Sequence, residues 1–257
     1  MSNEEHDETI LTPDALGTKM THMPDDADDL RKTTERGETG VLQHTLWYDN
    51  PSDINEQAHR AELIVRHEWD QFQLVNNEGG RANCQGNWPT FHQMRFSQFI
   101  TWPLELQASY MQDLQDADDT GRNLLTEKYA RMMSTTEPER YARELEPALP
   151  KLSVDRIARQ EKVIATQVEW ARQFRESWPK LGLAMRVLTT DEDEIDNTSF
   201  ETYLRGELST YSDTTFALYE SMIGTLVERG ENLTQATLLA TVRLGGFVDL
   251  DEAEAAQ

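Results

Sequence analysis

TWPLELQASYMQDLQDADDTGRNL (residues 101–124) and TYSDTTFALYESMIGTLVERGENL (residues 210–233) share one sparse pattern. Each begins with a threonine and an aromatic residue, has a tyrosine nine positions after the threonine, and ends in Gly-x-Asn-Leu. The offset between the two stretches is 109 throughout, so the pairing needs no gap. Glycine is favoured just after a helix and asparagine just before one. The pattern therefore predicts a helical unit that is used twice.

Outside these two stretches, apolar residues recur at helical spacing, and runs with the period of two that strands require are nearly absent. Glu68-Trp69 and Glu169-Trp170 extend the pairing at an offset of 101. We expect an all-α fold of two related multi-helix units, an internal duplication packed as one globular domain. The expected helices cover residues 56–75, 91–100, 101–121, 127–133, 153–174, 200–208, 212–229 and 234–244.

The predicted domain limits follow from changes in composition along the chain. Residues 1–54 are acidic and lack periodicity, which is typical of a disordered tail. One island in this tail, Leu46-Trp47-Tyr48, is apolar enough to dock on the body or on a partner. The remaining limits are a helical domain at 55–250, with unit one at about 55–135, a proline-containing connector at 136–152 and unit two at about 153–247, and an acidic C-terminal tail at 251–257.

The chain has 257 residues, a formal net charge of −23 and one cysteine. The negative charge argues against nucleic acid and anionic membranes as partners, because both require a cationic surface. A single cysteine excludes an intramolecular disulfide and a cysteine-based zinc site. The first residues lack a secretory signal pattern, and no apolar run reaches the length of a membrane span. We expect a cytoplasmic protein of bacterial type.

NNEGGRANCQ at residues 76–85 is the segment with the best ligand-binding composition. Its two adjacent glycines allow a ligand to approach the main chain, and its amide and charged side chains offer donors and acceptors. A hydrogen-bonded turn between helices is the alternative, and it explains the glycines equally well. The candidate binding residues are Asn77, Glu78, Gly79, Gly80, Arg81 and Gln85 in this loop, and Arg95 nearby.

The same region supplies candidates for catalysis. Cys84 or Glu78 is the candidate reactive group, with His92 or His67 as the base. A cysteine becomes a nucleophile only when a neighbouring base or cation lowers its pKa. No signature of a cysteine enzyme surrounds Cys84, so a small buried apolar residue is the alternative. The sequence leaves open whether the protein is an enzyme.

Metal and cofactor sites have weaker support. Glu56-x-x-His59 has the spacing of a carboxylate-bridged di-iron ligand pair, but the second Glu-x-x-His that such a bundle requires is missing. We expect no metal site and regard Glu56 and His59 as weak candidates on a polar helix face. The aromatic residues at matching positions, Trp102 with Tyr211 among them, are expected in the core or at the seam between the units, so no cofactor is identified.

Four arginines lie in or beside apolar helices: Arg95, Arg131, Arg205 and Arg243. A buried guanidinium requires carboxylate partners, and the candidates are Glu68, Glu127, Glu201 and Glu207. Arginines paired in this way would be structural. Arginines left unpaired in a cleft would instead bind an anionic ligand. The sequence does not separate these two cases.

Four long runs resemble an uncharacterised bacterial family, domain of unknown function 4125 (DUF4125). They are NNEGGRANCQ, TFHQMRFSQF, GRNLLTEKYARMM and TSFETYLRGELSTYS, and the resemblance covers about residues 56–250. It implies no activity, cofactor or catalytic residue.

Three functions fit these observations. The first is binding of a small molecule or peptide in a cleft at the seam of the two units. The second is an enzyme that uses Cys84 or Glu78 in that cleft. The third is an interaction scaffold whose acidic tail recruits a protein partner. Neither the ligand nor the oligomeric state follows from the sequence.

Overall fold

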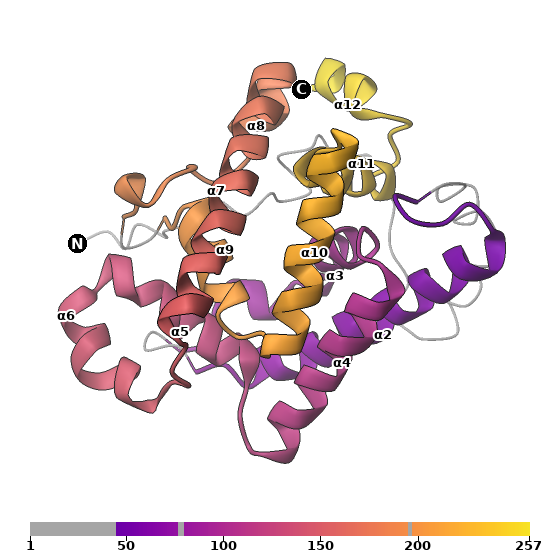
Figure 1. The fold of residues 1–257 in the computed structure, drawn as a ribbon. Helices are drawn as coiled ribbons and strands as arrows, with labels where there is room; N and C mark the ends of the chain where they lie inside the picture. Colours follow the sequence, from indigo (N-terminus) through magenta and orange to yellow (C-terminus); the bar gives the residue numbers. More distant parts are fainter. Residues whose placement is uncertain (1–44, 77–79, 195–196) are drawn as a thin grey trace.

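The computed structural model describes residues 45–76, 80–194 and 197–257, and every regular element within them is helical (Figure 1). This confirms the all-α prediction. The α-helices of this part are α2 (Pro51–Gln73), α3 (Trp88–Phe99), α4 (Leu104–Asp119), α5 (Leu124–Thr136), α6 (Pro138–Arg140), α7 (Val154–Ser177), α8 (Pro179–Leu183), α9 (Phe200–Leu208), α10 (Asp213–Arg229), α11 (Leu233–Leu244) and α12 (Leu250–Ala256). The short helical turns are η2 (Asn83–Gly86), η3 (Tyr141–Leu145), η4 (Glu146–Ala148) and η5 (Thr190–Glu192).

The two Gly-x-Asn-Leu motifs form the same helix-to-helix turn. Gly121 and Gly230 adopt left-handed conformations with φ of 70° and 68°, which glycine reaches without a steric penalty. The side chains of Asn123 and Asn232 then accept hydrogen bonds from the first turns of α5 and α11. Each such cap satisfies a backbone N–H that the helix itself leaves unpaired, and its loss costs about 1 kcal/mol.

The helices of the first half and the second half pack against one another at several interfaces. In Figure 1, α2 and α4 lie side by side, and α10 lies against α4. α5 runs along α9, and α11 packs against both α3 and α7. Gly206 makes the close approach of α5 and α9 possible, because a side chain there would meet the Lys128 carbonyl at 3.0 Å. Packing across the halves thus brings distant segments together.

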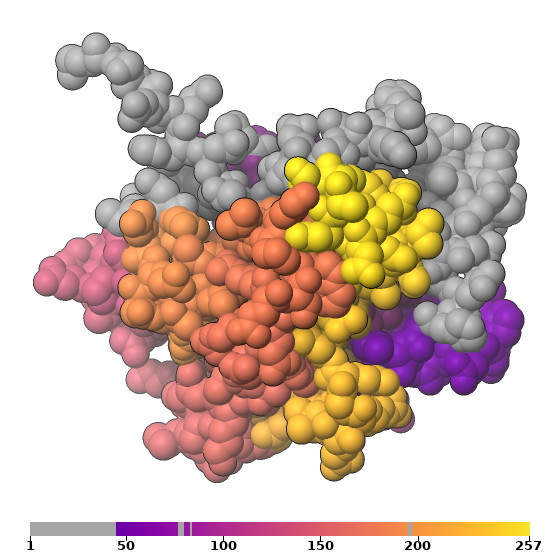
Figure 2. Space-filling view, turned by 90° about the horizontal axis from the view of Figure 1, so that it is seen from above, coloured from indigo at the N-terminus to yellow at the C-terminus, as the bar shows by residue number. Residues whose placement is uncertain are grey.

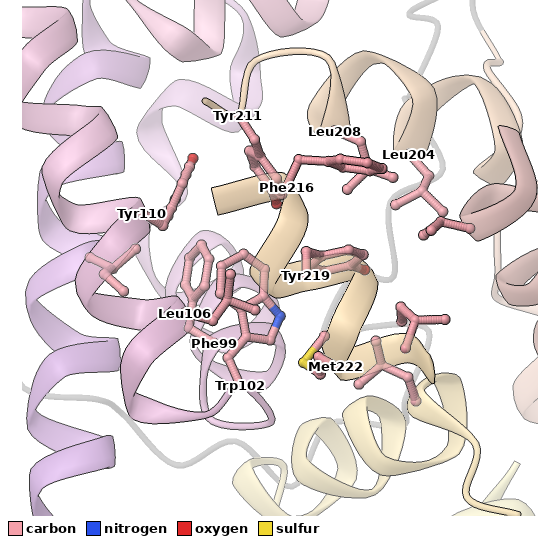
Figure 3. Close-up of a cluster of buried hydrophobic side chains, with 14 of the residues drawn as sticks. Phe99, Trp102, Leu106, Tyr110, Leu204, Leu208, Tyr211, Phe216, Tyr219 and Met222 are labelled. Atoms are coloured by element: carbon pink, nitrogen blue, oxygen red, sulfur yellow. The ribbon is translucent and has the colours of Figure 1, made fainter. Parts of the chain in front are cut away.

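Aromatic rings from the two quoted stretches meet in the centre of the largest core cluster (Figure 3). Trp102 lies 5.9 Å from Tyr211 and 5.6 Å from Tyr219, measured between ring centroids. Tyr110 lies 5.1 Å from Tyr211. All four rings are at most 3% exposed, so the expectation that they are core residues is confirmed. Edge and tilted contacts of this kind add about 0.5–1.5 kcal/mol per pair to the burial of the rings.

The island Leu46-Trp47-Tyr48 docks on the body of the domain. The indole N–H of Trp47 donates to the carbonyl oxygen of Thr101 at 2.7 Å. The hydroxyl oxygen of Tyr48 accepts from the backbone N–H of Leu104 at 2.9 Å. Tyr48 therefore satisfies the first N–H of α4. Residues 1–44 of the predicted tail lie outside the described residues.

The C-terminal residues form helix α12, whereas their acidic composition favoured a tail. Leu250 and Ala253 are buried, and Trp178 donates to Asp251 at 2.8 Å. The Glu254 carboxylate accepts the backbone N–H groups at the start of α8, where the helix dipole favours negative charge. Figure 2 shows the C-terminal residues covering one end of the body. The acidic residues here are helix caps and partners, which composition alone does not reveal.

None of the described helices has the length and apolar character required to cross a membrane.

Candidate functional site

The glycine-rich loop is a hydrogen-bonded turn in the part that the structure describes. Gln85 is 1% exposed, and its amide donates to the carbonyl oxygens of Phe72 and Val75 at 2.8 and 2.9 Å. Arg81 donates to the Gln85 carbonyl at 2.7 Å and to the side chain of Gln73. These contacts close the turn between α2 and α3. Asn77, Glu78 and Gly79 lie outside the described residues, and Gly80 at the edge of that gap has a φ of 92°.

Cys84 packs beside the cluster of Phe72, Val75 and Leu125. This contact is the one expected of a small apolar residue. The two histidine candidates each pair with a carboxylate. His92 Nε2 lies 2.6 Å from Glu62, and His67 Nε2 lies 2.7 Å from Asp118.

Glu62 sits at the centre of a small charged contact. Its burial alone would raise its pKa, but hydrogen bonds and charge interactions with His92 and Arg66 outweigh burial and lower the pKa below the usual range. His92 is 8% exposed and lies between the rings of Trp88 and Phe96. The structure therefore joins His92 to Glu62 and to aromatic rings.

The weak metal candidates lie on the outer face of α2. His59 is exposed, and Glu56 is paired with Arg60 at 2.7 Å. No group of three or more metal-ligating side chains occurs among the residues that the structure describes.

Arg95 is the centre of a buried charge cluster, which we call the Arg95 cluster: Arg95, Glu68, Glu207, Lys128 and Gln98. The guanidinium donates to both oxygens of Glu68 at 2.6 Å and to Glu207 at 3.0 Å. Lys128 adds a bond to Glu207 at 2.7 Å, and Gln98 adds another at 2.5 Å. The sequence expectation that Glu68 and Glu207 partner Arg95 is confirmed by these contacts.

The charges within the Arg95 cluster offset one another. Burial would raise the pKa of Glu207, but the charges of Arg95 and Lys128 outweigh burial and hold that pKa well below its usual range. Tyr110 and Tyr211 donate their hydroxyl protons to Glu68 and Glu207, and burial raises the pKa of both phenols. Every cation thus meets carboxylates at hydrogen-bond distance. Arg95, although expected at a ligand site, is fully used inside the protein.

A pocket of about 90 Å³ opens between α5, α9 and the turn η3. We call it the α5–α9 pocket. It joins segments from both halves and from the connector, which the sequence did not bring together. The lining residues are Arg131, Ser134, Thr135, Tyr141, Thr202, Arg205, Gly206 and Ser209.

The two arginines of the α5–α9 pocket differ in their partners. Arg205 pairs with Glu161 at 2.8 Å and with Glu201 at 2.5 Å, and these carboxylates raise its pKa. Arg131 donates through Nη2 to the carbonyl oxygen of Pro150 at 2.6 Å, while its Nε is buried and has no hydrogen-bond partner. Burial lowers the pKa of Arg131, and its interactions with neighbours offset this only in part. Arg131 is therefore a desolvated cation beside an open pocket.

The wall of the α5–α9 pocket is rich in hydroxyl groups whose orientations are partly set. Thr202 donates to Asp193 at 2.6 Å, and Ser209 donates to the Arg205 carbonyl at 2.7 Å. Tyr141 lies in η3, a π-helical turn, and such turns occur often at functional sites. In the sequence, Ser134 and Thr135 stand at the end of unit one, just before the connector, and nothing there indicated a pocket.

The chain belongs to the family described as "Protein of unknown function (DUF4125)", whose profile matches residues 59–255. This confirms the resemblance and extends it through α12. No curated protein and no solved structure matches the chain.

Proposed function

We propose that this domain binds a small polar molecule in the α5–α9 pocket. The observation that carries the proposal is Arg131, whose Nε is buried without a partner beside an open, hydroxyl-lined cavity. A buried donor without an acceptor costs about 1–3 kcal/mol, and a charged donor costs more. Nε itself is closed to solvent, so a ligand in the pocket would offset this cost through its charge and its contacts with the rest of the guanidinium. The expected cleft at the seam of the two units fits this location.

The volume of the pocket limits the size of the bound group. About 90 Å³ is several times the 10–15 Å³ that one water requires, and it is well below the roughly 300–1,000 Å³ of pockets for drug-sized ligands. The pocket therefore suits a molecule of a few heavy atoms, or the polar end of a longer molecule.

We also propose that the domain consists of two related four-helix units, α2–α5 and α7 with α9–α11. The support is a set of matching contacts. Trp102 meets Tyr219 while Tyr110 meets Tyr211, which is the reciprocal pairing of a twofold arrangement. Gln98 and Glu207, which are 109 positions apart, bond to each other.

The hydrogen bonds refine how the first helices of the two units correspond. Tyr110 donates to Glu68 as Tyr219 donates to Gln167. Asn123 likewise donates to the carbonyl of Gln71 as Asn232 donates to that of Trp170. These pairs favour an offset of 99 between α2 and α7, in place of the 101 given by the two Glu-Trp pairs.

The binding proposal is tested by thermal unfolding in the presence of small polar compounds, chosen to include acids, amines, amides and alcohols at about 10 mM. A ligand that binds only the folded state stabilises it by RT ln(1 + [L]/Kd), so one with a Kd near 1 mM adds about 1.4 kcal/mol. We expect at least one compound to raise the melting temperature of the wild-type protein by about 3–6 °C.

Two variants locate the binding site. Ser134→Phe places a ring at the pocket wall and should abolish the shift. Ser221→Phe adds the same ring to an exposed position on α10 and should preserve it. An equal shift in both variants would show that the compound binds elsewhere. The absence of any shift across all compound classes would contradict the proposal.

A further inference from the structure

We propose that the group held in the α5–α9 pocket is a carboxylate with a single negative charge, bound by Arg131. This inference rests on the proposed function and names the class of ligand. It starts from the position of Arg131 Nε, which is buried without an acceptor, while Nη2 of the same guanidinium is occupied by the Pro150 carbonyl.

Two other arginines of this domain, Arg95 and Arg205, pair with carboxylates, whereas Arg156 and Arg175 donate to backbone carbonyls as Arg131 does, but do not line the α5–α9 pocket. Arg95 meets Glu68 and Glu207, and Arg205 meets Glu161 and Glu201. In both cases the acceptors are carboxylates, which make charge-assisted hydrogen bonds about twice as strong as neutral ones. Arg131 has a backbone carbonyl in place of such a partner. A ligand carboxylate would supply what the protein provides elsewhere from its own side chains.

The hydroxyl groups of the pocket separate into acceptors and free donors. Thr202 and Ser209 already give their protons to Asp193 and to the Arg205 carbonyl. They can offer lone pairs to a ligand but no proton. Thr135 donates to the Met132 carbonyl, and Arg131 is hydrogen-bonded to the Tyr141 oxygen. The hydroxyl protons of Ser134 and Tyr141 remain as donors for an anion, beside the charge of Arg131. This is enough for the two oxygens of one carboxylate.

The surrounding charge favours one negative charge over two. The positive charge of Arg205 is already matched by Glu161 and Glu201. Asp193 adds a further negative charge through its bond to Thr202. Among the residues that line this pocket, Arg131 is the cation without a carboxylate at hydrogen-bond distance, and the charge of Glu127 offsets its desolvation only in part. A phosphate group carries a charge of about −1.5 to −2 at pH 7, and its second charge would face these carboxylates.

The experiment measures binding of acetate and propionate to the full-length protein at pH 7 by titration in the ¹H–¹⁵N NMR spectrum. Sodium chloride keeps the ionic strength constant, since exposed charges respond to salt. Acetamide and propionamide serve as neutral ligands of the same shape, and inorganic phosphate serves as the multivalent anion. We expect saturable shifts near residues 131–141 and 202–209 with the carboxylates, at least tenfold weaker binding of the amides, and no saturable response to phosphate.

Variants test the role of Arg131 directly. Arg131→Gln should weaken carboxylate binding at least tenfold, and Tyr141→Phe should weaken it several-fold. Arg172→Gln removes an exposed guanidinium that lies outside the pocket and should leave binding unchanged. Circular dichroism and the dispersion of the NMR spectrum show whether each variant is folded. A folded Arg131→Gln that bound acetate with wild-type affinity would overturn the inference.

The outcomes separate this inference from the proposed function. If the amides bound as tightly as the acids, or phosphate bound more tightly, the pocket would still be a binding site and the carboxylate inference would be wrong. If none of these ligands and none of the compound classes tested by thermal unfolding bound in the pocket, both proposals would fail.

Discussion

Arg95 and Arg131 lie in neighbouring parts of the sequence, yet their surroundings are opposite. Arg95 is 5% exposed and donates to two carboxylates and to Gln98. Arg131 borders an open pocket, donates to a backbone carbonyl and leaves Nε without an acceptor. Both guanidinium groups are desolvated, but the pKa of Arg95 is raised by its carboxylates despite burial, whereas the pKa of Arg131 is lowered by burial.

This difference separates a structural cation from a candidate binding cation. The Arg95 cluster is complete, so removal of any one of its four charged members leaves a buried charge without compensation. The Arg131 site is incomplete, so removal of Arg131 relieves an existing cost. Substitutions at the two sites should therefore change the free energy of unfolding by different amounts.

Glu207→Ala should produce the largest loss of stability. It removes a shared acceptor of Arg95 and Lys128 and leaves both cations buried. Breaking a buried pair from one side typically costs about 3–5 kcal/mol. The free energy of unfolding in urea measures the loss. Glu169→Ala is the matched control, because its ion pair with Arg172 is exposed and should contribute about 1 kcal/mol or less.

If Glu207→Ala lowered the free energy of unfolding no more than Glu169→Ala, the Arg95 cluster would not stabilise the fold. Arg95 would then not be a structural cation with which Arg131 can be contrasted.

The pH dependence of stability should report the same cluster. The pKa of Glu207 is held well below its usual range in the folded state by Arg95 and Lys128. The unfolded chain therefore binds the proton more readily, and the stabilisation from Glu207 is complete above the unfolded pKa, near pH 4.5, and is lost as pH falls. Urea unfolding between pH 3 and 7 should show a steeper loss for the wild type than for Glu207→Gln. Parallel curves would contradict this assignment.

Arg156 offers an intermediate case, because it is desolvated like Arg131 but lines no described pocket. It is 3% exposed, and its Nε has no hydrogen-bond partner. Its Nη2 donates to the Leu208 carbonyl at 2.8 Å, and its Nη1 lies 4.0 Å from the exposed carboxylate of Asp213. Burial lowers its pKa to about 10. A buried donor without a partner costs about 1–3 kcal/mol, and Arg156→Gln removes this cost. The substitution also loses the contact with the Phe216 ring, which reduces the gain. We therefore expect the free energy of unfolding to rise by about 1 kcal/mol at pH 7.

The sign of the pH effect for Arg156 is opposite to that of Glu207. Its folded pKa, about 10, lies below its unfolded value, so the unfolded chain holds the proton more strongly in the alkaline window that begins near pH 10. The cost of Arg156 should therefore fall as pH rises through this window. A clear destabilisation by Arg156→Gln at pH 7 would show that a buried guanidinium without a close carboxylate is not costly in this fold, and Arg131 would then have no cost for a ligand to offset.

The helices were predictable from the sequence because their signals are local. Gly121 with Asn123, and Gly230 with Asn232, end one helix and begin the next through contacts within a few residues. Helical spacing of apolar residues indicated the core. The helix α12 was not predicted, because its stability depends on Trp178 and on the start of α8, about 70 positions earlier in the chain.

The candidate site was predictable only in part. The sequence indicated that arginines in apolar helices either pair with carboxylates or bind a ligand, and both Arg95 and Arg131 were among the candidates. It favoured the loop of Arg81 and Gln85 because polar side chains beside glycines resemble a ligand loop. In the structure those side chains close their own turn. The pocket itself combines residues 131–141 with residues 202–209, and this proximity follows from the packing of α5 on α9.

Arg131→Gln should have the smallest effect on stability, and this result would distinguish Arg131 most clearly from Arg95. The substitution removes one hydrogen bond to the Pro150 carbonyl, worth about 1 kcal/mol. It also removes the cost of a guanidinium whose desolvation Glu127 and Tyr141 offset only in part, so the two changes should nearly cancel. We expect the free energy of unfolding in urea to change by less than about 0.5 kcal/mol. A loss of several kcal/mol, close to that of Glu207→Ala, would place Arg131 with Arg95 as a structural cation, because a site that awaits a ligand should not be required for folding.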